Sequence, residues 1–354
     1  MSQIDKLYIA ATGMITPVGF NTQMTAAAVN AGVSRVDDLS LLDKYLKPIK
    51  MSSIPSEVLL ENSNDELSPR RSRMLSMAGI ALSEAFTNFK LNEYEKLPLF
   101  IALPECLPKC VPAVNNNFVE LLIENTGLAI DKETSRQFFT GKAGGLQALD
   151  MAFKYLQSTE ARACVIGGVD SYFDPYLLGQ LDAQKRLNSQ HTDNGFIPAE
   201  AAAFLILTKD PIPSNNNRIE TALYSPAFSN ETGHIYSDKP YLGNALSHAS
   251  MNALTAAPNL NISSLVSSLN GESFGGKELG NTLSRQSKRL TGVEIEHPID
   301  CLGDIGAAFA PIVIAISAAI GKQENKLICC SSDLQYRSAV CLQTRLLGGE
   351  NAVR

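Results

Sequence analysis

The sequence has no run of basic residues and no apolar run long enough to cross a membrane. Its longest uncharged apolar stretch, Ile305 to Ile320, is shorter than the roughly 20 residues that a bilayer requires, and it contains Pro311. We therefore expect a helix buried inside the protein rather than a membrane span. The net charge is −6 and the lysines and arginines are scattered, so the chain is a poor ligand for polyanions and we expect no nucleic acid partner.

The cysteines lack the even count and regular spacing of a disulfide framework. They are Cys106, Cys110, Cys164, Cys301, Cys329, Cys330 and Cys341. We expect free thiols in a reducing cytosol, and the polar opening from Ser2 to Lys6 does not resemble a secretory leader, so we expect a cytoplasmic location. Cys106 and Cys110 have no Cys or His neighbours to complete a metal site, so we expect no metal and no cofactor.

Hydrophobic residues make up 45% and charged residues 19% of the 354 residues, as in an ordinary globular protein. Strand-like and helix-like segments alternate along the chain, and this alternation occurs in each of two halves, 1–210 and 211–354. It predicts an α/β fold with largely parallel sheets. We expect strands at 7–11, 97–102, 163–168, 201–207, 219–228, 262–267, 327–330 and 339–343. We expect helices at 21–31, 71–89, 115–125, 144–157, 243–256, 276–290 and 305–320, and a surface excursion at 33–70. Whether the halves are structural duplicates stays open.

Five segments, in one order along nearly the whole chain, resemble β-ketoacyl-acyl-carrier-protein synthases of the thiolase superfamily. Thr140 to Leu149 reads Thr-Gly-Lys-Ala-Gly-Gly-Leu-Gln-Ala-Leu and resembles the family's nucleophile elbow, Thr-Ala-Cys-Ser-Ser-Gly-Leu-Gln-Ala-Ile. The other four segments are Ile9 to Gly19, Cys164 to Asp170, Asn194 to Leu207 and Gly303 to Ala308. The resemblance implies a thiolase-like five-layer αβαβα fold built from two similar halves, which is dimeric in most members.

The residues that carry the chemistry of the family differ in this chain. Family members use a cysteine thiolate at a helix N-terminus and two histidines that stabilise developing negative charge. The resemblance places Lys142 at the cysteine, Asn270 at the first histidine and Asp304 at the second. It also aligns Asp333 to Ala339 with the family's glycine-rich turn, without the glycines. The four histidines of the chain, His191, His234, His248 and His297, fall outside these positions.

Two interpretations of Lys142 are open. A buried lysine can become a nucleophile when desolvation, together with a helix N-terminus, lowers its pKa. If the fold is right, however, Asp304 lies close by, and a Lys–Asp pair keeps the amine charged and unreactive. We therefore expect a salt bridge between Lys142 and Asp304 that fills the former catalytic cavity. Ser135 and Ser171 have no evident His or Asp partners for a hydrolase triad, and Gly275-Gly276-Lys277 lacks the spacing of a phosphate loop.

Three hypotheses for function follow. The first is a non-catalytic protein, a pseudoenzyme, that acts by binding a protein or a ligand, either like a chain-length factor or as an accessory protein of bacterial secretion-effector gene sets. Its partner would be a second copy, a related synthase, an effector or an acyl carrier protein. The second is an enzyme that uses Lys142 or Asp304 on an acyl thioester. The third is an ordinary 3-oxoacyl synthase, an acyltransferase whose nucleophile is Cys106, Cys164 or Cys301.

Overall fold

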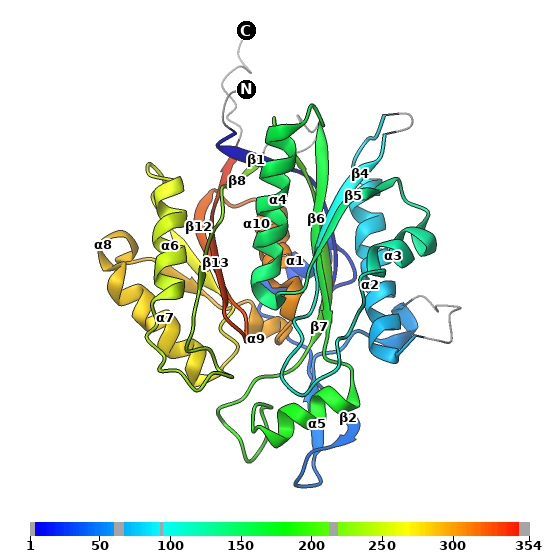
Figure 1. The fold of residues 1–354 in the computed structure, drawn as a ribbon, viewed down its shortest axis with the longest axis vertical. Helices are drawn as coiled ribbons and strands as arrows, with labels where there is room; N and C mark the ends of the chain where they lie inside the picture. Colours follow the sequence, from blue (N-terminus) through cyan, green and yellow to red (C-terminus); the bar gives the residue numbers. More distant parts are fainter. Residues whose placement is uncertain (1–3, 60–66, 93–94, 212–218, 347–354) are drawn as a thin grey trace.

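One large mixed β-sheet runs through the computed structural model, which describes residues 4–59, 67–92, 95–211 and 219–346 (Figure 1). Its strands are hydrogen-bonded in the order β5-β4-β6-β7-β1-β8-β13-β12-β10-β11, and β9 pairs with β13. The first-half strands are β1 (Lys6–Ile15), β4 (Leu97–Ala102), β5 (Ile130–Phe138), β6 (Ala163–Ser171) and β7 (Glu200–Thr208). The second-half strands are β8 (Ile219–Tyr224), β9 (Ala227–Asn230), β10 (Ser264–Ser267), β11 (Glu294–Glu296), β12 (Glu324–Ser331) and β13 (Tyr336–Leu346).

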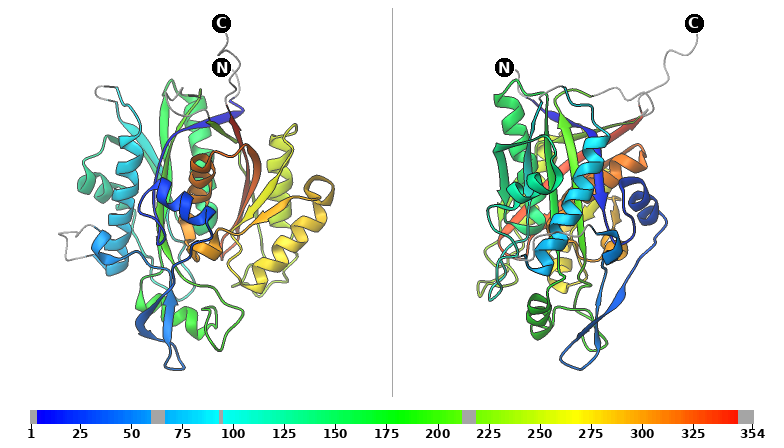
Figure 2. Two further views of the ribbon diagram at one scale, coloured as in Figure 1. Left: turned by 180° about the vertical axis from the view of Figure 1, so that it is seen from behind. Right: turned by 90° about the vertical axis from the view of Figure 1, so that its right-hand side faces the viewer.

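Helices cover both faces of the sheet and fill the space between its two halves (Figures 1 and 2). They are α1 (Thr22–Asn30), α2 (Pro69–Thr87), α3 (Phe118–Thr126), α4 (Gly144–Ser158), α5 (Pro175–Ala183), α6 (Ala245–Ala256), α7 (Ser273–Arg285), α8 (Ser287–Leu290), α9 (Ile299–Leu302) and α10 (Phe309–Ile320). Short 3₁₀ turns stand at Ser56–Val58, Gly141–Ala143 and Gly306–Ala308, the last two directly before α4 and α10.

The hydrophobic core shows how these elements form five layers. Side chains alternate between the two faces of a strand. In β6, Cys164 and Ile166 pack with α4 and α10 in a central cluster, whereas Val165 and Val169 pack with α2 and α3 in an outer cluster. In β12, Ile328 likewise faces the central helices, and the residues on either side of it pack with α6 and α7. The layers are therefore helix, sheet, helix, sheet, helix, which is the thiolase-like α/β fold.

The pairing of the strands repeats between the two halves. In the first half β4 pairs parallel with β5 and β6, while β7 pairs antiparallel with β6 and β1. In the second half β10 pairs parallel with β11 and β12, while β13 pairs antiparallel with β12 and β8. The expectation of largely parallel sheets was wrong, because the closing strand of each half runs antiparallel. We infer that the halves are duplicates whose boundary lies between β7 and β8, close to the 210/211 division.

Most of the expected elements are present, with some differences at their ends. Asn21 caps α1 as expected, its side chain accepting a hydrogen bond from the Met24 amide. The expected strand at 219–228 is two strands, β8 and β9, and the expected helix at 276–290 is α7 followed by α8. The stretch from Ile305 to Ile320 forms a 3₁₀ turn and the buried helix α10. In the described part of the chain, no helix is long and apolar enough to span a membrane.

A small lobe projects from the lower end of the molecule in Figures 1 and 2. The sequence predicted a surface excursion here but not its strands. The lobe contains a separate two-stranded sheet of β2 (Asp37–Leu42) and β3 (Pro48–Met51) within the expected surface excursion at 33–70, of which 60–66 lie outside the described residues. An isolated hairpin is marginally stable in water. Here Ile49 and Met51 of the hairpin pack with Leu177 and Leu181 of α5, which anchors the hairpin to that helix.

Candidate functional site

Lys142 lies at the N-terminal end of α4, at the centre of the molecule. The chain leaves β5, turns at Gly141 and enters α4 through the 3₁₀ turn that carries Lys142. Gly141 has a φ of +59°, and a Cβ there would lie 2.8 Å from Oε1 of Glu105. At Gly145 a Cβ would lie 2.6 Å from Cδ of Pro311, so the two central helices approach more closely than any larger residue allows. These glycines fix the position of Lys142 between the two halves.

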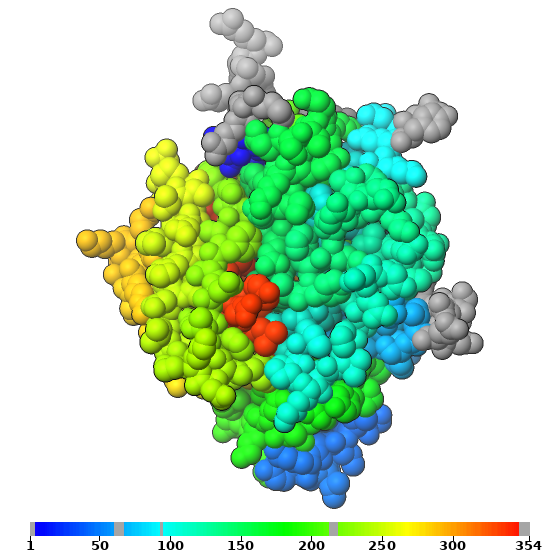
Figure 3. Space-filling model, viewed as in Figure 1, coloured from blue at the N-terminus to red at the C-terminus, as the bar shows by residue number. Residues whose placement is uncertain are grey.

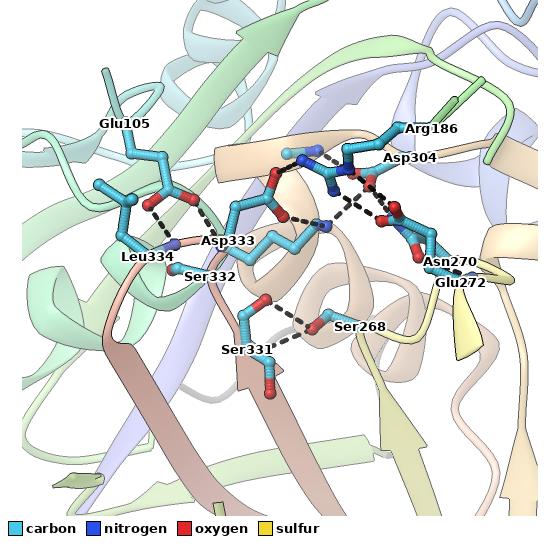
Figure 4. Close-up of polar contacts among 12 residues, drawn as sticks. Glu105, Arg186, Ser268, Asn270, Glu272, Asp304, Ser331, Ser332, Asp333 and Leu334 are labelled. Atoms are coloured by element: carbon cyan, nitrogen blue, oxygen red, sulfur yellow. Dashed lines mark hydrogen bonds and ion pairs between the residues drawn. The ribbon is translucent and has the colours of Figure 1, made fainter. Parts of the chain in front are cut away.

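The ammonium group of Lys142 is held by two carboxylates, those of Asp304 and Asp333, which are labelled in Figure 4. Its Nζ is 2.7 Å from Oδ2 of Asp304 and 3.7 Å from Oδ1 of Asp333. Asn270 Nδ2 donates to the same Asp304 oxygen at 2.7 Å. The structure therefore brings together the three positions singled out in the sequence, and the expected ion pair between Lys142 and Asp304 is confirmed.

A second cation, Arg186, completes the network, and the sequence gave no signal for it. Its guanidinium makes two hydrogen bonds to Glu272, at 2.7 and 2.6 Å, and a third to Oδ2 of Asp333 at 2.6 Å. It also donates to the Tyr236 hydroxyl at 2.7 Å. Asp333 thus lies between Arg186 and Lys142. Asn270 extends the network, since its Nδ2 is also 3.1 Å from Oε2 of Glu272.

Glu105 lies on the other side of Asp333 and fixes the turn that follows β12. Its two oxygens accept hydrogen bonds from the backbone amides of Asp333, at 2.7 Å, and Leu334, at 3.1 Å. Burial, reinforced by the negative charge of Asp333, raises the pKa of Glu105 to about 8, so this carboxyl holds a proton at neutral pH. Because the protonated Glu105 is neutral, it adds no further buried negative charge beside Asp333.

The electrostatics of the site keep Lys142 protonated. Burial opposes its charge, but the carboxylates of Asp304 and Asp333 outweigh burial and raise the pKa of Lys142 well above its usual range. Burial likewise opposes ionisation of Asp333, yet Arg186 and Lys142 hold the pKa of that carboxyl well below its usual range. An ammonium has no free electron pair, so Lys142 in this state is not a nucleophile.

The side chains of Lys142 and Asp333 border two small cavities. One, of about 40 Å³, is lined by Ser268, Asn270 and Arg337 among others. The other, of about 20 Å³, lies under Glu105 and is bordered by Cys110 and Asp170. Cavities of this size have space for about one to three water molecules. The charged network therefore occupies the centre of the molecule, with only narrow spaces on either side of it.

The alternative nucleophiles lie elsewhere. Cys164 is fully buried in β6, and burial raises its thiol pKa far above the usual range. Burial also raises the pKa of Cys301 in α9, and Cys106 lies on an exposed loop. The cysteine that borders a cavity beside Lys142 is Cys110, which was not among the nucleophiles expected from the sequence. Burial raises the pKa of its thiol too.

The remaining candidate residues form no further centre of chemistry. Ser171 donates to Glu200 and Ser135 donates to the backbone oxygen of Asp131, so neither has a histidine partner in the described structure. Among the described residues, no group of three or more His, Cys, Asp or Glu side chains could hold a metal ion. Lys277 lies in α7 rather than in a loop that could hold a phosphate.

Comparison with known proteins places this geometry in context. Residues 134–211, which include the elbow with Lys142, match the family described as β-ketoacyl synthase, N-terminal domain. The 3-oxoacyl-[acyl-carrier-protein] synthase 2 of Staphylococcus aureus (strain COL) is 23% identical, in an alignment that covers 58% of this chain and 58% of that enzyme.

Solved structures are similar over nearly the whole chain. One belongs to a complex of a type II polyketide synthase acyl-carrier protein with its ketosynthase bound to a hexaketide; its TM-score is 0.74 at 15% identity, covering 96% of this chain and 99% of that one. The ishigamide ketosynthase/chain length factor has a TM-score of 0.66 at 17% identity, covering 97% and 100%.

A five-layer arrangement of helices and sheets, with a central helix entered through a glycine-bordered turn, is the thiolase-like fold. Within that fold the chain is similar to β-ketoacyl synthases, as the family match over residues 134–211 and the synthase relative agree.

Proposed function

We propose that this protein is a ketoacyl-synthase-like protein without condensing activity, which acts by binding another protein. The observation that carries the proposal is the ion pair of Lys142 with Asp304 and Asp333 at the N-terminal end of α4. The resemblance puts the family's thiolate at Lys142 and its two histidines at Asn270 and Asp304. A thiolate attacks a thioester carbonyl, whereas a protonated amine in a salt bridge does not.

Three properties of the site support this proposal. The oxyanion chemistry of the family requires hydrogen-bond donors directed at developing negative charge. Here the carboxylates of Asp304 and Asp333 face the same space, and a negative charge beside them is repelled. The turn at Asp333 to Ala339 has no glycine and is fixed by Glu105 and Arg337. The cavities beside Lys142 hold a few water molecules rather than an acyl chain.

A role in protein binding is the alternative that the fold supports best. We place the protein in the cytoplasm as a dimer, either with a second copy or with a related synthase, in the manner of a chain-length factor. The nine-residue strand β5 is an edge of the main sheet and pairs only with β4 among the described strands. Such an edge presents unpaired amides and carbonyls to which a second chain can add a strand.

The test is an assay of the purified protein with malonyl- and acyl-loaded acyl carrier protein, alone and with an intact synthase of the same bacterium. We expect no 3-oxoacyl product and no carbon dioxide release from the protein alone. We also expect no covalent adduct in its intact mass after incubation with an acyl thioester. Product formation by the protein alone would contradict the proposal.

The same mass measurement separates the two enzymatic alternatives. An adduct lost on substitution Lys142→Ala would support altered chemistry at that lysine. An adduct lost instead on Cys110→Ser or Cys106→Ser would support a displaced thiol nucleophile. Size-exclusion chromatography with light scattering then distinguishes a homodimer from a complex with the synthase.

A further inference from the structure

The lobe at the lower end of the molecule carries strained backbone at exposed positions. We use "α5 lobe" for the hairpin β2–β3, the loop 104–112, α5 and the following segment 184–192. The non-glycine residues with positive φ in the described chain are Leu46 (61°), Lys109 (65°) and Lys185 (58°), and all three lie in the α5 lobe. The left-handed backbone conformation costs a residue with a Cβ roughly 1–2 kcal/mol. Glycine or asparagine would avoid that strain, so the side chains themselves need an explanation.

The tip of the hairpin is ordered in spite of this strain. The Asp43 carboxylate accepts hydrogen bonds from the amides of Tyr45, at 2.8 Å, and Lys47, at 2.9 Å. The Asp43 amide in turn donates to the Lys47 carbonyl at 2.7 Å. The amide of Lys44 donates to Asp182 at the end of α5, at 2.9 Å, which ties the tip to the lobe. The tip therefore presents Leu46 in a fixed direction.

Large apolar side chains on this lobe face solvent. Leu46 is 77% exposed and Val111 is 74% exposed, the two highest values among the exposed large hydrophobic residues described. Leu42, Tyr45 and Tyr176 of the lobe are about half exposed. A single exposed leucine is ordinary on a protein surface. At Leu46, however, exposure coincides with backbone strain, and both are unfavourable in the isolated chain.

The charge around these side chains is predominantly positive. The exposed aspartates of the lobe, Asp37 and Asp38, lie at the start of β2, away from the hairpin tip, where Asp37 pairs with Arg35 and Asp38 lies opposite Lys50. The exposed charged residues within 42–50, 106–112 and 175–192 are Lys44, Lys47, Lys50, Lys109 and Lys185. The two aspartates in these segments are not exposed: Asp43 is buried under the tip, and Asp182 is half-buried and accepts from Lys44. The whole chain has a net charge of −6, so this is a local basic surface on an acidic protein. Figure 3 shows the hairpin (blue) directly below α5 (green) at the lower end of the molecule.

We propose that the α5 lobe is a docking surface for a second protein, whose binding site is an apolar pocket rimmed by acidic residues. Leu46 inserts into the pocket, and the five lysines pair with the acidic rim. Burial of Leu46 offsets the strain at the tip, and the backbone of the tip is already ordered by its hydrogen bonds, so binding costs little further backbone freedom. The complementary charges accelerate encounter and select the partner. This inference rests on the proposed binding function and names the kind of partner that it needs.

The experiment begins with a photo-cross-linking amino acid at position 46 in living cells, and at Leu242 as a matched control. Leu242 is also exposed, at 58%, but lies outside the lobe. We expect one protein to be cross-linked from position 46 and not from position 242. That protein is then purified and titrated with the intact chain and its variants. Absence of a specific cross-link from position 46 would overturn the proposal.

Three variants then test the binding mode against the purified partner. Leu46→Asp should weaken binding about tenfold or more, because it puts a charge into the apolar pocket. Leu46→Gly should weaken binding while leaving thermal stability unchanged or higher, because it removes the contact and the strain together. Lys47→Glu with Lys50→Glu should weaken binding strongly at low salt and less at high salt. Equal binding by all variants would overturn the proposal.

Two further arms exclude other occupants of the lobe. Sedimentation with vesicles of phosphatidylglycerol and phosphatidylcholine should leave the protein in the supernatant, and binding abolished by Leu46→Asp would instead assign the lobe to an anionic membrane. Self-association abolished by the same substitution would assign it to a second copy. If the proposed function is wrong, the condensation assay yields a 3-oxoacyl product. The binding measurements described here do not report that product, so the two failures are distinguishable.

Discussion

The substitution Lys142→Met tests the central ion pair most directly. Methionine has nearly the shape of lysine but no charge, so the change removes the ammonium while leaving most of the packing around α4. It strands Asp304, whose side chain is 1% exposed and now has Asn270 as its remaining side-chain partner. It also removes one of the two cations that form ion pairs with Asp333.

The size of the effect follows from the burial of the pair. Removing one partner of a buried ion pair costs about 3–5 kcal/mol, because the other charge stays buried without compensation. The matched control is Lys154→Met in α4, where the lysine is 67% exposed and forms a pair with Asp150 one helical turn away. Exposed pairs of that spacing contribute about 0.3–0.5 kcal/mol. The two substitutions are chemically identical, so the difference between them isolates burial.

Equilibrium unfolding in urea measures both variants. We expect Lys142→Met to lose several kcal/mol and Lys154→Met to lose less than about 1 kcal/mol. The pKa of Lys142 is raised in the folded state, so its stabilisation is fully present below the usual lysine pKa and constant across neutral pH. In the variant, Asp304 is left as a buried carboxylate without its cation, which is the source of the loss. A loss as small as that of the control would refute the reasoning.

Three further predictions concern the surroundings of Lys142. The pKa of Glu105 is about 8 in the folded protein against an ordinary 4.5, so its contribution to stability is present below pH 4.5 and is lost as the pH rises toward 8. The free energy of unfolding in urea, plotted against pH over this window, should therefore change less for Glu105→Gln than for the wild type. Parallel plots for the two proteins would contradict the assignment. Gly141→Ala should destabilise the protein by at least about 1–2 kcal/mol, because φ is +59° and the new Cβ meets Glu105. The control Gly179→Ala in α5, where a Cβ has no atom within 4 Å, should be neutral or stabilising. Equal melting temperatures of the two variants would show that the turn at Gly141 relaxes. Arg186→Met should lower the free energy of unfolding in urea by about 3–5 kcal/mol. Arg186→Lys should recover only part of that loss, because an ammonium cannot bridge Glu272 and Asp333 as the guanidinium does. Full recovery by lysine would show that charge alone matters.

The parts of the fold that the sequence predicted are those with a local cause. The helix from 144 to 157 was predicted from its apolar spacing, and the structure gives Gly144–Ser158 with Leu146, Leu149 and Leu156 buried. The strands β6 and β7 were predicted because both of their faces are buried, which leaves a continuous apolar run. Strand β5 was missed because it is a half-exposed edge whose residues, such as Glu133 and Arg136, do not alternate in polarity.

The candidate site was predicted only where flanking glycines and strand patterns aligned it with a known family. That alignment gave Lys142, Asn270 and Asp304. Asn270 and Asp304 follow Lys142 by 128 and 162 positions in the sequence, but the three side chains meet at one carboxylate in space. Arg186 and Glu272 were missed, because a charged residue in a loop is expected to be solvent-exposed. Their burial depends on the tertiary fold, which the local sequence does not show. The antiparallel closing strands were missed for a similar reason, since the direction of a strand depends on its connection and not on its own residues.

The network also disfavours a thiolate at position 142. A cysteine at position 142 would lie beside Asp304 and Asp333, whose negative charges raise rather than lower the pKa of a thiol. Changing Asp304 to histidine would leave Asp333, whose carboxylate is held ionised by Arg186. Arg186 in turn is held by Glu272, which approaches Asn270. Each charged member is paired with the next, so a neutral replacement of any one of them leaves a buried charge without a partner.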